Sequence, residues 1–161
     1  MVMTDSALHD SESGLLNEAY FQVALPNRVA SARRVLRPLS IALLALGDAD
    51  ARPGRCRPSL AAQIAVALLE TLRESDTACR TNDGGFALVL EDTPEDGAIW
   101  TIERARRLLI DSGEQLTLWA GVASYPAHAL EAPDLLKRAA AALALAGEWS
   151  QSRIEVAAPA D

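Results

Sequence analysis

The sequence predicts a single α/β domain in which a sheet of about five strands is packed by helices. The chain has 161 residues, and a typical domain has about 100–200 residues. Half of the residues are apolar and 23% are charged, so the chain has enough hydrophobic material for a core. Segments with helical apolar spacing alternate with short apolar runs typical of strands, in the order helix, β, α, β, β, α, β, α, β.

The first half of the chain contains two helices and one strand. Residues 17–37 repeat apolar side chains at helical spacing, and Pro26 predicts a kink or a break within them. Residues 39–46 are apolar apart from Ser40, which favours a buried strand. Residues 47–59 are rich in Gly, Pro and Arg and predict a loop, and residues 59–73 predict a strong helix.

The second half begins with a hairpin and then alternates between helix and strand. Two short strands, 77–81 and 85–91, flank Asn82-Asp83-Gly84-Gly85, a turn sequence that tolerates positive φ. The remaining predicted elements are helices at 94–111 and 133–146 and strands at 116–124 and 153–156. We therefore expect a flexible N-terminus over 1–13, one domain over 14–157 and a tail over 158–161.

Composition excludes several classes of function. A formal charge of −7 argues against binding to DNA or RNA, which needs a basic surface. The chain has no run of 18 apolar residues and no signal peptide, so we expect no membrane insertion and a cytoplasmic location. Two cysteines and two histidines without a CxxC motif disfavour a disulfide framework and a zinc site.

A series of short motifs, in one order and at one spacing, points to a single family. The motifs are Asp10-Ser11-Glu12-Ser13-Gly14-Leu15-Leu16-Asn17, Arg37-Pro38-Leu39-Ser40, Leu72-Arg73-Glu74-Ser75-Asp76, Arg80, Phe86, Gly121-Val122-Ala123, Tyr125-Pro126 and Leu135-Leu136-Lys137-Arg138-Ala139. Over about residues 10–156 the chain resembles the GGDEF (diguanylate cyclase) domain. The resemblance implies a nucleotidyl-cyclase palm, with a mostly antiparallel sheet packed by helices.

The resemblance also implies that the catalytic groups are missing. The G-G-D-E-F signature of the family falls on residues 82–86, so Gly84 and Gly85 stand where the family has its acidic pair. Ala45 stands where the first strand should end in a metal-binding aspartate. Mg²⁺ needs such carboxylates to stabilise phosphoryl transfer. We therefore expect no catalytic residue, no metal site and no cofactor, which describes a pseudoenzyme.

One functional element of the family is present. Arg73-Glu74-Ser75-Asp76 matches the R-x-x-D inhibitory site that binds cyclic di-GMP, and five residues separate it from Asn82. Arg104 matches a second arginine of that site on the next helix. The residue types suit a guanine nucleotide, because arginine pairs with guanine O6 and N7 or with phosphate, and a carboxylate accepts from guanine N1–H and N2–H. The sequence thus predicts a cyclic di-GMP receptor that signals through a protein partner or a homodimer.

Other interpretations stay open. The domain could be a scaffold or dimerisation module that binds no nucleotide, with the R-x-x-D residues forming only a solvated ion pair. A third reading is residual GTP binding or cyclase activity, for which Asp48 and Asp50 are candidate displaced metal ligands.

The tryptophans and two further arginines also receive predictions. Trp100 and Trp119 are expected in the core rather than as ligand platforms, and Trp149 as an interface residue. Arg106 and Arg107 are expected on a solvated face, with contact to a ligand phosphate as the alternative.

Overall fold

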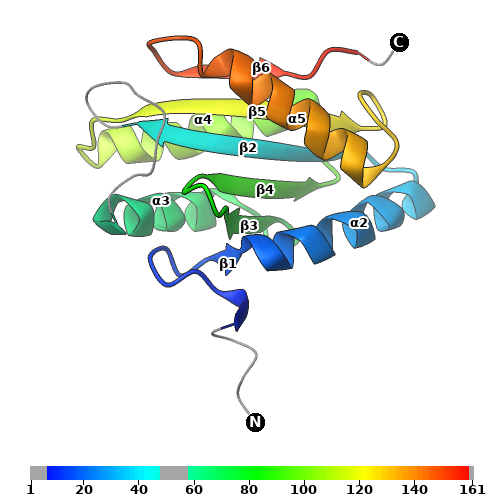
Figure 1. Cartoon of the computed structure of the whole chain (residues 1–161), viewed down its shortest axis with the longest axis horizontal. Helices are drawn as coiled ribbons and strands as arrows, with labels where there is room; N and C mark the ends of the chain where they lie inside the picture. Colours follow the sequence, from blue (N-terminus) through cyan, green and yellow to red (C-terminus); the bar gives the residue numbers. More distant parts are fainter. Residues whose placement is uncertain (1–6, 48–57, 160–161) are drawn as a thin grey trace.

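The computed structural model describes residues 7–47 and 58–159, which form one sheet with two helices on each face (Figure 1). In chain order the elements are β1 (Leu16–Asn17), α2 (Glu18–Val35), β2 (Leu39–Gly47), α3 (Pro58–Thr71), β3 (Thr77–Arg80), β4 (Phe86–Glu91), α4 (Glu95–Asp111), β5 (Thr117–Tyr125), α5 (Ala132–Ala146) and β6 (Arg153–Val156). None of the helices in these two ranges is long and apolar enough to cross a bilayer.

The sheet has six strands in the order β1-β3-β4-β2-β5-β6. The three central pairings are antiparallel, and the two outer pairings, β1 with β3 and β5 with β6, are parallel. The predicted mostly antiparallel α/β architecture is therefore confirmed, but the expected count of about five strands is one too low. The missed strand, β1, has two residues, too few for the period-2 pattern that identifies a strand.

The apolar run of β2 supplies both faces of the core. Successive side chains of a strand point to opposite faces of the sheet. Ala42, Leu44 and Leu46 accordingly pack with α3 and α4, whereas Ile41 and Leu43 pack with α2 and α5. The central position of β2 explains why it is apolar apart from Ser40, whose buried hydroxyl is hydrogen-bonded to the Thr93 carbonyl oxygen and to Ser124.

Helix α2 continues through Pro26, so the predicted break does not occur. Pro26 is exposed, while Phe21, Leu25 and Val29 on either side of it are buried against the sheet. This buried stripe holds the helix on both sides of the proline. Asn17 caps the N-terminus of the helix, and its side-chain oxygen accepts a hydrogen bond from the Tyr20 N–H at 3.1 Å.

The tryptophan predictions have mixed outcomes. Trp119 on β5 is fully buried, as predicted. Trp100 on α4 is 62% exposed, so its predicted place in the core is wrong. The buried residues of α4 are Ala98, Ile102, Ala105 and Leu109. Trp100 lies on the opposite side of the helix from this stripe, because a residue two positions from Ala98 or Ile102 is turned by about 200°.

Candidate functional site

The β3–β4 hairpin is fixed by the buried side chain of Arg80. Its Nε donates to the carbonyl oxygen of Gly84 at 3.2 Å, and its guanidinium carbon lies 5.1 Å from the centroid of the Phe86 ring. Arg80 also pairs with Asp10 at 3.4 Å and with Glu12 at 3.7 Å. Part of the predicted flexible N-terminus, residues 7–13, thus contacts the hairpin, whereas residues 1–6 lie outside the described ranges.

The ionisation of Asp10 reflects this arrangement. Burial alone would raise the pKa of Asp10, but hydrogen bonds from Ser13 and the charge of Arg80 outweigh it and lower the pKa. The hydroxyl of Ser13 donates to the Asp10 carboxylate at 2.6 Å. Asp10 is therefore held as a carboxylate against the buried arginine.

Backbone geometry explains the two glycines of the hairpin. Gly84 has φ of +91°, a conformation that L side chains rarely adopt. A Cβ atom at Gly85 would lie 2.4 Å from the carbonyl oxygen of Leu44 on β2, well inside contact distance. A side chain at position 84 would therefore adopt a strained backbone conformation, and one at position 85 would fit only if the hairpin moved away from β2.

A cavity of about 340 Å³ lies between α2, the end of β2, the hairpin and α5. Its lining includes Ala45 and Gly85 and two carboxylates, Glu18 and Asp83. Both carboxylates already accept hydrogen bonds, Glu18 from the Asn82 amide and Asp83 from the Gly85 N–H.

This donor set does not fit the Mg²⁺ ions of a phosphoryl-transfer enzyme, which need several oxygen ligands close together. Nowhere in residues 7–47 and 58–159 do three His, Cys, Asp or Glu side chains gather at a position suited to a metal ion. The candidate ligands Asp48 and Asp50 lie outside those ranges.

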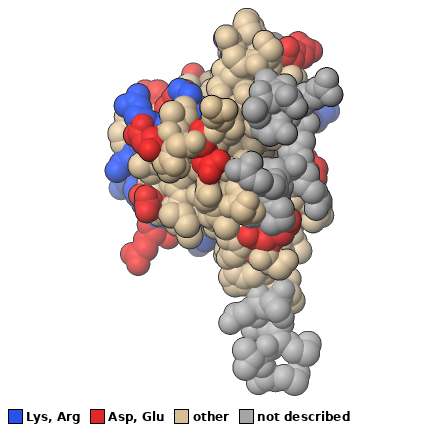
Figure 2. All heavy atoms as spheres, turned by 90° about the vertical axis from the view of Figure 1, so that its left-hand side faces the viewer, with Lys and Arg blue, Asp and Glu red and all other residues tan. Residues whose placement is uncertain are grey.

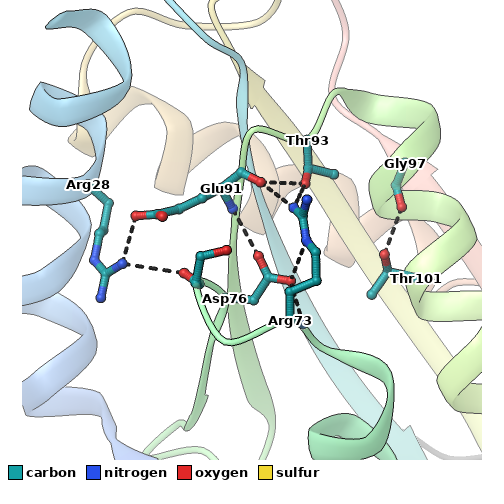
Figure 3. Close-up of polar contacts among 8 residues, drawn as sticks. Arg28, Arg73, Asp76, Glu91, Thr93, Gly97 and Thr101 are labelled. Atoms are coloured by element: carbon teal, nitrogen blue, oxygen red, sulfur yellow. Dashed lines mark hydrogen bonds and ion pairs between the residues drawn. The ribbon is translucent and has the colours of Figure 1, made fainter. Parts of the chain in front are cut away.

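Arg73 and Asp76 lie where α3 ends and the chain turns into β3 (Figure 3). Both bind Glu91, the last residue of β4, and Arg73 also binds Thr93 just after it. The Asp76 side chain is 4% exposed. Its Oδ1 accepts from the Glu91 N–H at 3.1 Å, and its Oδ2 accepts from the Arg73 N–H at 3.0 Å. The Arg73 guanidinium donates to the Thr93 hydroxyl at 2.7 Å and to the Glu91 carbonyl oxygen. The two residues are thus neighbours, as the i,i+3 spacing predicts, and are held by internal partners.

The same segment is tied to α2 on the other face of the sheet (Figure 3). Arg28 of α2 donates to the Glu91 carboxylate at 2.7 Å and to the Ser75 carbonyl oxygen at 3.4 Å. The pairing with Glu91 raises the pKa of the Arg28 guanidinium. Residues 73–76 are therefore connected through Glu91 to a helix on the opposite face.

Arg104 lies further along α4 and is exposed. Its guanidinium carbon is 5.4 Å from the centroid of the Trp100 ring. It lines a cavity of about 370 Å³ with Trp100, Glu103, Arg107, Leu108 and Asp111. Among the contacts of the described residues, Arg104 pairs with neither Arg73 nor Asp76, so the three predicted site residues do not form one cluster bonded together.

Arg106 and Arg107 both lie on the outer surface of α4, as the solvated-face prediction expects, and contact with a ligand phosphate stays a prediction. Arg106 pairs with Glu103 at 2.9 Å on the helix surface, a solvated pair. Arg107 shares the cavity with Arg104. On the face drawn in Figure 2, basic and acidic side chains lie close to one another rather than in one broad basic area.

These elements define a class of protein: a palm-like sheet with a β3–β4 hairpin at the end of its central strand. The family model for the diguanylate cyclase GGDEF domain matches residues 59–153. The chain belongs to the GGDEF family. No match was found among curated protein sequences.

Solved structures agree with this assignment. The GGDEF domain of PA1120 (TpbB or YfiN) from Pseudomonas aeruginosa is 23% identical, covers 93% of this chain and 94% of its own, and has a TM-score of 0.81. The coiled coil and GGDEF domain of DgcB from Caulobacter crescentus, solved with cyclic di-GMP, is 16% identical over 95% and 87%, with a TM-score of 0.80. SiaD of P. aeruginosa, solved with its activator SiaC, is 22% identical over 96% of this chain and 64% of its own, with a TM-score of 0.79.

Sequence reasoning missed the internal partners of the R-x-x-D residues. Glu91 contributes backbone atoms to these bonds, and backbone atoms leave no trace in a sequence motif. Thr93 is buried two residues before α4, and its hydroxyl bonds with Arg73 and Glu91, but its burial depends on the tertiary structure and gives no signal in the sequence.

Proposed function

We propose that this chain is a catalytically inactive GGDEF domain that acts as a cytoplasmic cyclic di-GMP receptor and relays the signal by protein contact. Arg73, Asp76 and Arg104 are the residues proposed to bind the ligand. The observation that carries the proposal is the position of Arg73: its side chain is 55% exposed at the end of α3, and it is anchored to the connection that leads into α4, the helix of Arg104.

The free donor capacity of Arg73 supports this role. Its Nε and Nη2 donate within the protein, and among the described residues its Nη1 has no partner. A guanidinium held on one edge by Asp76 presents its other edge at a defined angle, which favours recognition of a planar guanine or a phosphate. If Nη2 of Arg73 released the Glu91 carbonyl oxygen, it could donate to the ligand together with Nη1.

Asp76 contributes differently in this conformation. Both of its oxygens accept hydrogen bonds from backbone N–H groups, and the side chain is almost fully buried. Asp76 orients Arg73, and it reaches a guanine edge only when the segment after β4 moves. The proposed binding therefore includes a displacement of residues 91–93.

Two features support the absence of catalysis. The hairpin disfavours a side chain at position 84 through its backbone conformation and at position 85 through contact with Leu44, and the resemblance puts the acidic pair at these two positions. Ala45 of β2 supplies no ligand. Without carboxylates at these positions, nothing there recruits the metal ions that stabilise a transferring phosphoryl group.

Calorimetric titration of cyclic di-GMP into the wild-type chain and into Arg73→Ala tests the proposal. We expect binding at micromolar affinity or better, about −8 kcal/mol, and its loss in Arg73→Ala. Arg34→Ala, an exposed arginine on α2, is the matched control and should bind as the wild type does. No heat and no thermal shift with the wild-type chain would exclude a receptor role. Sedimentation with saturating ligand then tests for a ligand-dependent homodimer.

A scaffold that binds no nucleotide is the second candidate, and one observation favours it: Arg73 and Asp76 are already paired with protein groups. The relative SiaD was solved with a protein activator. Absence of cyclic di-GMP binding together with a stable dimer or protein complex would support this candidate. Binding or turnover of GTP with Mg²⁺ would instead support a residual cyclase.

A further inference from the structure

The outer face of α4 exposes an aromatic ring in a protein with few of them. Aromatic residues make up 4% of the chain, and Trp100 is 62% exposed. An indole left in water forgoes the stabilisation that its burial would give. The exposure is therefore a feature of the surface rather than of the core.

Trp100 stands beside two positive charges. Arg104 follows one helical turn later, with its guanidinium carbon 5.4 Å from the ring centroid. Both residues line the cavity of about 370 Å³ that also contains Arg107. Glu103 in this lining is paired with Arg106. The cavity thus combines an apolar plane with two guanidinium groups, and Asp111 adds one further carboxylate to its lining.

We propose that Trp100 is a stacking residue for a guanine base of the bound ligand, with Arg104 and Arg107 placed for its phosphates. The proposal rests on the proposed function, because it assumes a ligand that reaches Arg104. Any planar ligand bound to that guanidinium in this cavity meets the indole, which lines the same cavity. Indole rings and guanidinium planes both stack on nucleobases, and neighbouring arginines bind phosphate oxygens.

The chain provides an internal control for this geometry. Trp149 is 44% exposed, and Arg153 lies over its ring at 4.4 Å from the centroid. This second Trp–Arg pair lies at β6, the strand at the edge of the sheet, and does not line the α4 cavity. A general effect of removing an exposed indole would appear equally at both positions.

The experiment titrates cyclic di-GMP into the wild-type chain and into Trp100→Ala, Trp100→Phe and Trp149→Ala. Calorimetry and tryptophan fluorescence measure the binding. Trp100→Ala should weaken binding by about tenfold or more, since base stacking on an aromatic side chain has an effect of that order. Trp100→Phe keeps a ring and should retain most of the affinity. Trp149→Ala should bind as the wild type does. The ligand should still quench the tryptophan fluorescence of this variant, because Trp100 is retained.

The outcomes separate this inference from the proposed function. Binding by Trp100→Ala within about twofold of the wild type overturns the stacking role while the receptor role stands. Unchanged ligand binding with loss of self-association in Trp100→Ala assigns the indole to a protein contact, which also overturns it. No binding by the wild-type chain overturns the proposed function and this inference together. Because Trp100 is exposed, the melting temperature of Trp100→Ala should match the wild type and exclude misfolding.

Discussion

Replacing Asp76 by alanine tests how strongly the turn after α3 is held to Glu91, the last residue of β4. The substitution removes the acceptor of two backbone N–H groups, those of Glu91 at 3.1 Å and Arg73 at 3.0 Å, and the pairing with the Arg73 Nε at 3.4 Å. A hydrogen bond to a charged group contributes about 1.5–3 kcal/mol, and water replaces part of what is lost at Arg73, whose side chain is 55% exposed. We therefore expect the free energy of unfolding to fall by about 2–3 kcal/mol.

Thermal unfolding followed by circular dichroism at neutral pH measures this change. For a domain of this size 1 kcal/mol shifts the melting temperature by about 2–4 °C, so we expect a decrease of about 4–12 °C. Asp76→Asn keeps one acceptor oxygen and should lose roughly half as much. Glu74→Ala, an exposed neighbour in the same motif, is the control and should change stability by less than about 0.5 kcal/mol. A wild-type melting temperature for Asp76→Ala would refute the role of Asp76 as a structural anchor.

Two further outcomes follow from the hairpin and its arginine. Gly85→Ala brings a Cβ to 2.4 Å from the Leu44 carbonyl oxygen, so urea unfolding should show a loss of about 1–3 kcal/mol, whereas equal stability would mean that the strands separate freely. The pKa of Asp10 is lowered in the folded state, so its stabilising effect is present above the unfolded pKa of about 3.9 and disappears as pH falls through the folded value. Asp10→Asn should therefore be less stable than the wild type at pH 7 and differ less from it near pH 2; a constant difference across this range would contradict the assignment.

The helices and strands could be predicted because their patterns are long. The amphipathic pattern of α4 extends over 17 residues, and the apolar run lies in β2, which has nine. The predicted and observed boundaries of both elements therefore agree closely. Strand β1 could not be predicted, since its two residues carry no period. The predicted break at Pro26 does not occur because the residues around it, Leu25 and Val29, are buried against the sheet. This packing is a tertiary effect that the local sequence does not show.

The candidate site was only partly predictable. The sequence places Arg73 and Asp76 as neighbours, and the structure has them paired at 3.4 Å. That both bind residues 91–93 depends on the position of β4 beside β3, which no local motif encodes. Trp100 was assigned to the core from its residue type, although its phase relative to Ala98 and Ile102 places it on the outer side of α4.

The close approach of the hairpin to β2 limits which substitutions the hairpin can accept. A single substitution at position 84 meets an unfavourable backbone conformation, and one at position 85 meets the Leu44 carbonyl oxygen. Each single step toward an acidic pair at these positions therefore costs stability, at position 84 through backbone strain and at position 85 through separation of the hairpin from β2. The evolutionary path from this chain to an enzyme with carboxylates in the hairpin passes through less stable intermediates, so selection for a folded protein alone keeps the two glycines in place.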